Sequence, residues 1–278
     1  MSSSAKIPTL RCVVPTLNSE ATLDTTLLSL HSQRQINIEV VVADSGSTDK
    51  TLEICQRWQT PVIYVPPGNM YQAINAGLRG CKTDWLAYLN SDDWVYSDSF
   101  SRLVSCGESL KADVVYGNCD YTDGQGRFVY SLAAAKPEHL LPLFRNRCMG
   151  FAQQAAIFRC RSYQRLQGFD ESFLYRGDAD FYIRALFAGL QFGYLEGPSV
   201  ACFRLHEKQF SNRGLALTEV EAERIFNKPE MKPGIRGRLI FARWRMKNLP
   251  HYLIRIVRES LLTKRLRFPR SIEPYTHR

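Results

Sequence analysis

Residues 39–44 read Glu-Val-Val-Val-Ala-Asp, a short apolar run that ends on a carboxylate. A run this short and this rich in valine predicts a buried strand rather than a helix. A second apolar run, Arg11-Cys-Val-Val-Pro15, precedes it. Between the two, residues 18–32 carry leucines at near-helical spacing. The order strand, helix, strand is therefore expected at the start of the chain.

The same alternation continues toward the C-terminus. Helices are predicted over residues 48–58 and 71–79, and strands over 62–65 and 85–89. Alternating strands and helices indicate an α/β protein with a Rossmann-like, mainly parallel sheet flanked by helices. Ligands bind such sheets at the carboxyl ends of the strands, which is where Asp44 and Asp92 fall.

Beyond residue 93 the pattern becomes less regular. We expect a helix over residues 178–188 and further strands, some of them antiparallel, at 113–117, 128–130, 155–158, 192–195 and 200–204.

Charge divides the chain into two parts. From Lys232 to the C-terminus there are 13 Lys and Arg against 2 acidic residues, so this segment carries +11 and the preceding 231 residues carry −2. We therefore expect a catalytic domain over residues 1–231 and a basic tail over 232–278. Residues 234–270 are predicted to form two basic amphipathic helices separated by Asn248-Leu-Pro250.

The tail suits two kinds of partner. Basic and apolar residues interleaved on a helix favour an anionic membrane surface. Alternatively, the apolar faces pack on the domain or on a second subunit of a homo-oligomer. Nucleic acid is not expected as a partner, because no recognisable base-reading module accompanies the charge.

Cysteine usage and hydropathy bear on the compartment. The eight cysteines form no CxxC pair, and several lie in apolar runs, which favours a reducing environment. Residues 1–8 have no apolar core of the kind a signal peptide needs, and no stretch reaches the length of a membrane span. A cytoplasmic protein is expected, with the tail as a means of peripheral attachment to the inner face of the membrane.

The acidic cluster Asn90-Ser91-Asp92-Asp93 follows directly after the strand expected at 85–89. Hard oxygen ligands at a strand end suit Mg²⁺ or Mn²⁺, which binds few protein carboxylates and completes its coordination with phosphate oxygens. Such an ion stabilises a departing diphosphate. The alternative is a solvated turn, since the same residue types are common in turns.

Four blocks of sequence closely resemble, in order and spacing, the family 2 glycosyltransferases with a GT-A fold. They are Pro15-Thr-Leu-Asn-Ser-Glu20, Val41-Val-Ala-Asp-Ser-Gly-Ser-Thr-Asp49, Met70-Tyr-Gln-Ala-Ile-Asn-Ala-Gly77 and Tyr88-Leu-Asn-Ser-Asp-Asp93. The resemblance covers residues 8–213 and continues through Gln153-Gln154-Ala155, Gly168-Phe-Asp-Glu-Ser172, Gly177-Asp-Ala-Asp180 and Arg204-Leu-His206.

The resemblance implies a fold and an activity. It implies a GT-A domain with a donor half over residues 8–115 and an acceptor half over 116–213. The implied reaction is inverting transfer of a sugar from a nucleoside diphosphate sugar, with UDP-sugars favoured, to a hydroxyl of a saccharide or lipid-linked acceptor. The implied cofactor is Mn²⁺ or Mg²⁺.

Roles on the donor side follow from the matched positions. The resemblance places the nucleotide beside Thr16, Asn18, Glu20, Asp44, Asn75 and Ser91, with Asp44 accepting a hydrogen bond from the base. It makes metal ligands of Asp92, Asp93 and His206, and a phosphate contact of Arg204. The residues also have structural alternatives: Asp44 and Ser47 are suited to capping a helix, and a lone His is often structural.

On the acceptor side the resemblance makes Asp178 the general base. Inverting transfer needs one carboxylate opposite the leaving diphosphate to take the proton of the attacking hydroxyl. The alternative is an acid in the first turn of a helix, favoured there by the helix dipole. Gln153 and Gln154 are expected to contact sugar hydroxyls through their amides.

Two departures from close relatives leave other functions open. Asn90 stands where many relatives carry the first Asp of a D-x-D motif, and Gln72 stands where they carry an acid. A catalytically silent nucleotide-binding protein is therefore an alternative. A nucleotidyltransferase is a second one, although Pro15-Thr-Leu-Asn-Ser-Glu20 occupies the place of the glycine-rich basic loop it needs.

Overall fold

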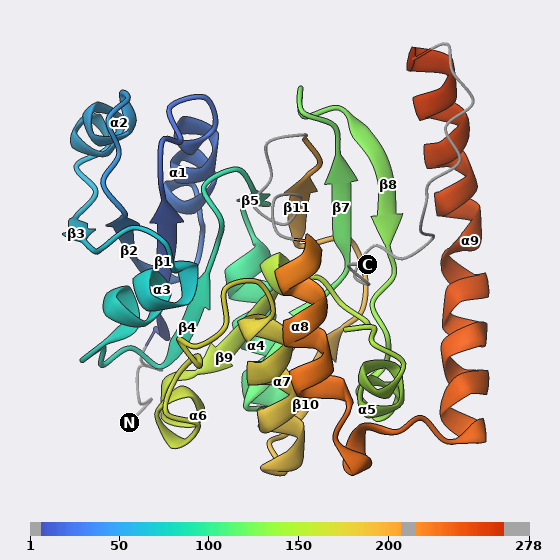
Figure 1. Ribbon diagram of the computed structural model, residues 1–278. Coiled ribbons are helices and arrows are strands. Elements are labelled where there is room, and N and C mark those ends of the chain that lie inside the picture. Colours follow the sequence, from blue (N-terminus) through green and yellow to red (C-terminus); the bar gives the residue numbers. More distant parts are fainter. Residues whose placement is uncertain (1–6, 207–214, 264–278) are drawn as a thin grey trace, which may run out of the picture.

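The computed structural model describes residues 7–206 and 215–263, which are built around a seven-stranded sheet (Figure 1). Its order is β10-β6-β9-β4-β1-β2-β3, and all neighbours are parallel except β9, which runs antiparallel to β4 and β6. The expected α/β class and mainly parallel sheet are confirmed. The strands are β1 (Thr9–Thr16), β2 (Asn37–Asp44), β3 (Val62–Tyr64), β4 (Trp85–Tyr88), β6 (Val114–Gly117), β9 (Ala156–Arg159) and β10 (Phe192–Leu195).

A second sheet of four strands, in the order β5-β11-β7-β8, lies beside the first. Its strands are β5 (Trp94–Val95), β7 (Cys119–Thr122), β8 (Phe128–Leu132) and β11 (Ala201–Arg204). Residues 90–93 connect β4 of the first sheet to β5 of the second. The acidic cluster therefore lies where the chain passes from one sheet to the other.

Helices flank the large sheet. α3 packs on β1 and β2, and α4 packs on β6 and β10. A side chain at Gly77 of α3 would bring a Cβ within 2.6 Å of a Val13 methyl, so only glycine permits this close approach. The helices are α1 (Leu23–His31), α2 (Thr51–Arg57), α3 (Met70–Leu78), α4 (Ser99–Leu110), α5 (Pro137–Arg145), η1 (Gln153–Ala155), α6 (Cys160–Arg165), α7 (Gly177–Phe187), α8 (Leu215–Phe226), η3 (Pro229–Met231) and α9 (Ile235–Thr263).

The elements predicted from the sequence are present with boundaries shifted by a few residues. Among the elements that were not predicted, α4 had a clear signal. Its residues Phe100, Leu103, Val104 and Gly107 repeat at helical spacing, and all four are buried.

The prediction of two helices in the tail is wrong. α9 is one helix from Ile235 to Thr263, and Pro250 lies inside it. Proline removes one backbone hydrogen bond, but packing of the inner face offsets that loss. The Asn248 amide donates to the Trp244 carbonyl (3.1 Å) and accepts from the Ala133 N–H (3.0 Å), which ties the helix to the chain just after β8. The last part of the expected second helix, residues 264–270, lies outside the described residues.

α9 packs on α5 and along β8, the outermost strand of the small sheet (Figure 1). An exposed edge strand is prone to pair with other chains, and a covering helix prevents this. Trp244 is buried and belongs to the main cluster of core side chains. None of the described helices combines the length and the apolar composition that crossing a bilayer requires.

Candidate active site

Hydrogen bonds join the loop that follows β1 to the loop that follows β2. Asn18, in the left-handed region at φ 51°, accepts a hydrogen bond from the Thr48 N–H (2.8 Å). The Glu20 carboxylate accepts one from the Lys50 N–H (3.1 Å), and the Glu20 N–H donates to Asp49 (3.0 Å). These contacts hold Asn18 and Glu20, both predicted to border the nucleoside, against the loop that follows β2.

Asp44 is fully buried at the end of β2. Its carboxylate accepts hydrogen bonds from the N–H groups of Gly46 (3.0 Å) and Ser47 (2.9 Å), and from the hydroxyls of Thr16 (3.3 Å) and Ser47. The carboxylate therefore shapes the turn after β2. A hydrogen bond to a base stays a prediction, and it would require one of these internal bonds to be exchanged.

The structural alternative, in which Ser47 caps the next helix, does not hold. α2 begins at Thr51, and it is Asp49 whose carboxylate accepts the Thr51 N–H (3.0 Å). The glycine at 46, with φ 90°, and the turn around Asp44 delay the start of the helix by several residues.

The acidic cluster contacts both the N-terminal loop and the late strand β11. The hydroxyls of Ser91 and Ser19 lie 2.7 Å apart, so the cluster lies against the β1–α1 loop. The Asp92 carboxylate lies 2.8 Å from Nε2 of His206, although the two residues are 114 positions apart in the chain. Both side chains are about a quarter exposed, at 24% and 25%. Two predicted metal ligands are thus brought together at the surface.

Asp93, unlike its neighbour Asp92, is fully buried. Its carboxylate accepts hydrogen bonds from the Arg204 N–H (2.9 Å), the Gln154 amide (2.8 Å) and the Asn90 amide (3.4 Å). Burial raises the pKa of Asp93 well above its usual value, and the charge of Asp92 raises it further. Asp93 therefore holds β11 and η1 against the cluster. A metal–ligand role for Asp93 stays a prediction that would require these contacts to be given up.

The remaining donors of the cluster fit a divalent cation. The Asn90 amide directs its nitrogen to Asp93, and its oxygen is buried without a hydrogen-bond partner in the part of the chain that the structure describes. Asp92 and His206 supply one carboxylate and one ring nitrogen at a common point. Over residues 7–206 and 215–263 no group of three His, Cys, Asp or Glu could hold a metal ion. The site therefore fits Mg²⁺ or Mn²⁺ only with phosphate oxygens completing the coordination.

Three residues predicted to contact substrate make contacts within the protein. The Gln153 amide donates to the Tyr88 carbonyl (2.8 Å), and the Gln154 amide is engaged by Asp93. Both glutamines are buried, so the structure does not support their predicted contacts with sugar hydroxyls. The Arg204 guanidinium lies over the Trp94 ring at 5.0 Å and donates to the Gly124 carbonyl (3.4 Å). Residues 207–214, which follow His206, lie outside the described residues.

Asp178 is half-buried in the first turn of α7. Its carboxylate accepts hydrogen bonds from the Ala179 N–H (2.7 Å) and the Tyr71 hydroxyl (3.4 Å). Burial raises the pKa of Asp178, while the charge of Arg176 and these hydrogen bonds partly oppose the rise. Burial also raises the pKa of Tyr88, and the charges of Asp178 and Asp93 contribute to that rise. Asp178 thus lies within electrostatic reach of the end of β4.

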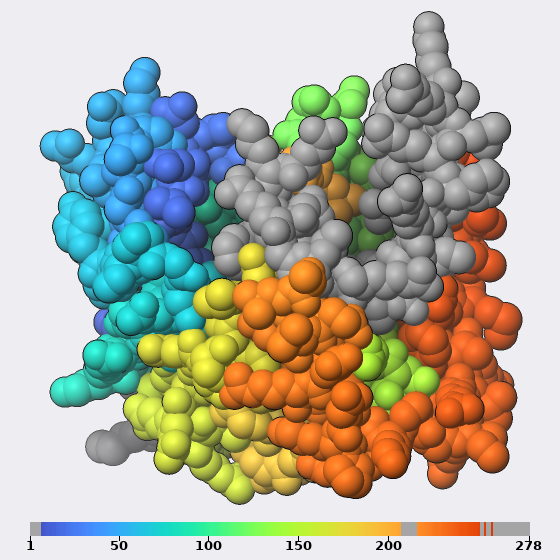
Figure 2. Space-filling view, viewed as in Figure 1, coloured from blue at the N-terminus to red at the C-terminus, as the bar shows by residue number. Residues whose placement is uncertain are grey.

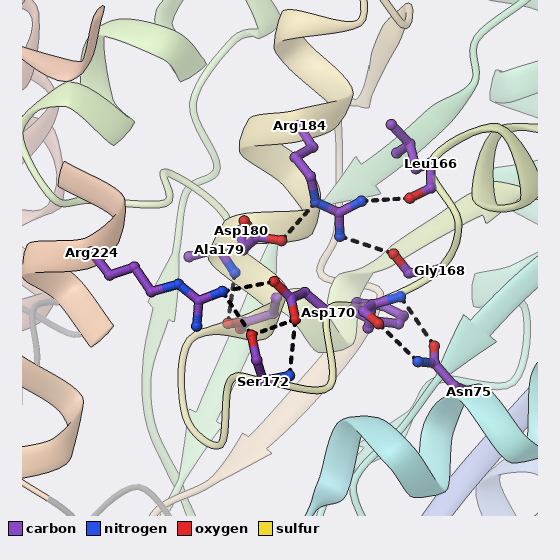
Figure 3. A network of polar contacts seen from close by, with 11 residues as sticks. Asn75, Leu166, Gly168, Asp170, Ser172, Ala179, Asp180, Arg184 and Arg224 are labelled. Carbon is purple, nitrogen blue, oxygen red and sulfur yellow. Dashed lines mark hydrogen bonds and ion pairs between the residues drawn. The ribbon is translucent and has the colours of Figure 1, made fainter. Parts of the chain in front are cut away.

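Asn75, predicted to contact the nucleotide, instead anchors the loop before α7 (Figure 3). Its amide donates to the Phe169 carbonyl (2.8 Å) and to Glu171 (2.9 Å), and its oxygen accepts from the Phe169 N–H (3.0 Å) and the Tyr163 hydroxyl (2.8 Å). All its polar atoms are engaged, so a nucleotide contact stays a prediction that these bonds do not favour.

Two arginines that the sequence analysis did not single out hold the other side of this loop (Figure 3). Arg184 of α7 donates to the carbonyls of Leu166 (2.7 Å) and Gly168 (2.9 Å) and pairs with Asp180 (2.6 Å). Arg224 of α8 contacts Asp170 and Ser172. The spacing of Asp180 and Arg184, four residues apart on a helix, is the signal that could have revealed the first of them.

Glu221 of α8 is the third residue that the sequence analysis missed. It is buried, and its carboxylate accepts hydrogen bonds from the N–H groups of Leu174 (2.6 Å), Tyr175 (3.0 Å) and Arg176 (2.9 Å). These residues lead directly into Asp178 at the start of α7. Figure 2 shows α8, in orange, covering this part of the molecule on the face in view.

Replacing Glu221 with Ala is expected to lower the free energy of unfolding by about 3 kcal/mol, because three N–H groups lose their acceptor. Urea denaturation measures this change. Glu219→Ala on the same helix is the matched control, since Glu219 forms only a half-exposed ion pair with Arg147 (2.6 Å), and its loss costs about 1 kcal/mol or less. Equal effects of the two substitutions would contradict the role assigned to Glu221.

The fold and the site together define a class of protein. The mainly parallel sheet that passes into a smaller second sheet is the arrangement of the GT-A fold. The family model described as "Glycosyl transferase family 2" matches residues 12–166. The chain belongs to this family.

Relatives of known sequence point the same way. The chain is 30% identical over 126 residues to "Glycosyltransferase GlyA" of Streptococcus pneumoniae, a match that covers 43% of this chain and 18% of that protein. It is 24% identical over 240 residues to "Putative glycosyltransferase EpsH" of Bacillus subtilis, which covers 77% of this chain and 68% of that one. The chain thus spans less than a fifth of GlyA, and it spans 58% of an uncharacterized glycosyltransferase of Haemophilus influenzae.

Solved structures show the same fold at low identity. S. aureus TarS 1–349 in complex with UDP-GlcNAc superimposes with a TM-score of 0.58 at 16% identity, over 92% of each chain. The mannosyltransferase PcManGT from Pyrobaculum calidifontis, in complex with GDP-Man and Mn²⁺, gives a TM-score of 0.61 at 16% identity, over 93% of this chain and 81% of that one.

Proposed function

We propose that this protein is an inverting glycosyltransferase that moves a sugar from a nucleoside diphosphate donor, with UDP-sugars favoured, to a hydroxyl of a saccharide or lipid-linked acceptor. The observation that carries the proposal is the contact between Asp92 and His206 at the end of β4. The complexes of TarS with UDP-GlcNAc and of PcManGT with GDP-Man and Mn²⁺ support a diphosphate donor and a divalent ion. Because those two donors carry different bases, the choice of uridine is our own proposal.

In the proposed reaction Asp92 and His206 hold Mg²⁺ or Mn²⁺, which when bound neutralises the charge of the departing diphosphate. Asp178 accepts the proton of the acceptor hydroxyl as its oxygen forms the new bond to the anomeric carbon. The bond from that carbon to the diphosphate breaks on the opposite face, so the sugar is transferred with inversion. The charge of Arg176 and the hydrogen bond from Tyr71 favour the charged form of Asp178 and so partly oppose the effect of burial, which raises its pKa.

The alternative of a catalytically silent nucleotide-binding protein makes a different prediction about turnover. The test is a thermal-shift screen of UDP-, GDP- and dTDP-sugars with and without Mn²⁺, followed by measurement of nucleoside diphosphate release. A bound donor stabilises the native state by mass action. Metal-dependent stabilisation with release of diphosphate supports the transferase, whereas stabilisation without release from any donor would support the silent protein.

The raised pKa of Asp178 sets the acidic limit of the reaction. A base works only when deprotonated, so kcat/KM is expected to fall as the pH drops through the pKa of Asp178, at a higher pH than for an ordinary Asp. Tyr71→Phe removes a hydrogen bond that lowers this pKa and should move the acidic limb further up in pH. A pH profile of kcat/KM for both proteins measures the shift. A limb that stays in place or moves down would contradict Asp178 as the base.

A further inference from the structure

The outer face of α9 carries an apolar stripe that the other described residues leave exposed. Its residues are 41% to 81% exposed, and they are Ile235, Leu239, Met246, Leu249, Leu253 and Val257. On a helix with about 3.6 residues per turn these positions fall within a stripe roughly 80° wide, which runs for about 33 Å. A line of apolar side chains of this length is unusual on a protein surface.

The stripe lies opposite the face that binds the protein. Trp244 and Asn248 are buried, Phe241 packs against the core cluster, and all three lie on the far side of the helix from Leu239 and Leu253. The helix is therefore already anchored to β8 and α5 through one face. Its second apolar face is left for another partner.

Basic residues border the stripe on both sides. Arg236, Arg243 and Lys247 lie along one edge and Arg238 along the other, and all four are exposed. From Lys232 to Arg258 the sequence contains eight Lys and Arg and no acidic residue. A second copy of this chain would bring the same positive charge to the contact, and like charges would repel.

We propose that the outer face of α9 docks the protein on an anionic lipid surface. The helix lies parallel to the membrane plane, its leucines and its Met enter the boundary between headgroups and acyl chains, and its arginines bind the lipid phosphates. The helix is too polar to cross a bilayer, and docking is reversible and weakened by salt. This surface is separate from the site around Asp92 and does not depend on the proposed chemistry.

Vesicle co-sedimentation of the full chain tests the proposal. Vesicles of phosphatidylcholine with 30% phosphatidylglycerol are compared with vesicles of phosphatidylcholine alone. We expect the protein to bind the anionic vesicles at least tenfold more tightly, and to be released at 0.5 M NaCl. Equal binding to the two kinds of vesicle, or binding to neither, would overturn the proposal.

Substitutions test whether the apolar stripe of α9, and not another exposed apolar surface, binds the vesicles. Leu239→Gln with Leu253→Gln should lower the affinity for anionic vesicles about tenfold or more. Leu110→Gln with Phe187→Gln is the matched control, since these residues are 55% and 49% exposed elsewhere on the protein, and it should leave binding unchanged. Circular dichroism and the Tm confirm that both variants are folded.

Measuring the mass of the protein in solution tests the alternative that a second copy of this chain covers the stripe. If the wild-type chain is a dimer by light scattering, and Leu239→Gln with Leu253→Gln makes it a monomer without changing vesicle binding, the stripe is a subunit interface and the proposal is wrong. If the variant loses vesicle binding while its mass in solution stays the same, the lipid surface is supported.

Discussion

Replacing Asp178 with Asn is expected to lower kcat by about a thousandfold while the affinity for the nucleotide donor stays within a few-fold of wild type. An amide has nearly the same shape but cannot accept the proton, and general base catalysis contributes typically 10² to 10⁴ in rate. The donor does not need this carboxylate for binding, because the proposed cation site lies at Asp92. Single-turnover kinetics with a saturating donor, together with calorimetric binding of UDP and Mn²⁺, separate the two quantities.

Asp180→Asn is the matched control for this variant. Asp180 lies two residues further along α7, and its carboxylate pairs with Arg184 (2.6 Å) rather than facing Tyr71. Its loss should lower the free energy of unfolding by about 1 kcal/mol and leave kcat within several-fold of wild type. A similar kcat loss in the two variants would show that Asp178 acts through the structure of α7 and not as a base.

The second large effect is expected at Asp92. Asp92→Asn removes the charged ligand from the proposed cation site and should weaken Mn²⁺-dependent binding of UDP about a hundredfold, with a similar or larger loss of kcat/KM. Binding of UDP without metal should change little, because the loops around Asn18 and Glu20 are untouched. Isothermal titration of UDP with and without Mn²⁺ measures the difference.

Asp98→Asn provides the control, since this exposed acid lies a few residues beyond the cluster and only pairs with Arg102 (3.6 Å). His206→Ala should reproduce the loss seen with Asp92→Asn in part, because a neutral ring nitrogen contributes less than a carboxylate. If Asp92→Asn retained full Mn²⁺-dependent binding of UDP, the Asp92 carboxylate would not be a ligand of the cation.

The sequence alone was sufficient for the framework of the protein. The runs of β2 and β4 are too short for helices, the leucines of α1 repeat at near-helical spacing, and the strand ends place Asp44 and Asp92 at one edge of the sheet. The resemblance of both segments to one family implied that Asp92 and His206 share one metal site; the structure places them 2.8 Å apart, and their role as metal ligands stays a prediction. Family membership and the mainly parallel sheet are confirmed.

The direction in which neighbouring side chains point could not be predicted. Asp92 and Asp93 are adjacent and chemically identical, yet one faces the surface and the other is buried beneath Arg204 and Gln154. That choice depends on the contact between β11 and the cluster, which joins residues more than a hundred positions apart. The same long-range packing turned Gln153 inward toward the Tyr88 carbonyl.

The tail shows a second limit of sequence patterns. Pro250 suggested a break between two helices, and the apolar residues suggested one face that either packs on the protein or meets a membrane. In the structure one helix carries both kinds of face, because Trp244 and Asn248 anchor it while Leu239 and Leu253 point outward. The sequence pattern contains the apolar residues of both faces. Only the packing of α9 on β8 determines which face is buried and which is exposed.

We propose that a divalent cation held by Asp92 and His206 binds the donor diphosphate. Crystals grown with UDP and Mn²⁺, measured at the manganese absorption edge, test it directly. We expect one anomalous peak at roughly 2.1 Å from an Asp92 oxygen, in contact with Nε2 of His206 and with diphosphate oxygens. A nucleotide bound at the ends of β1 and β4 with no manganese peak beside Asp92 would contradict the claim.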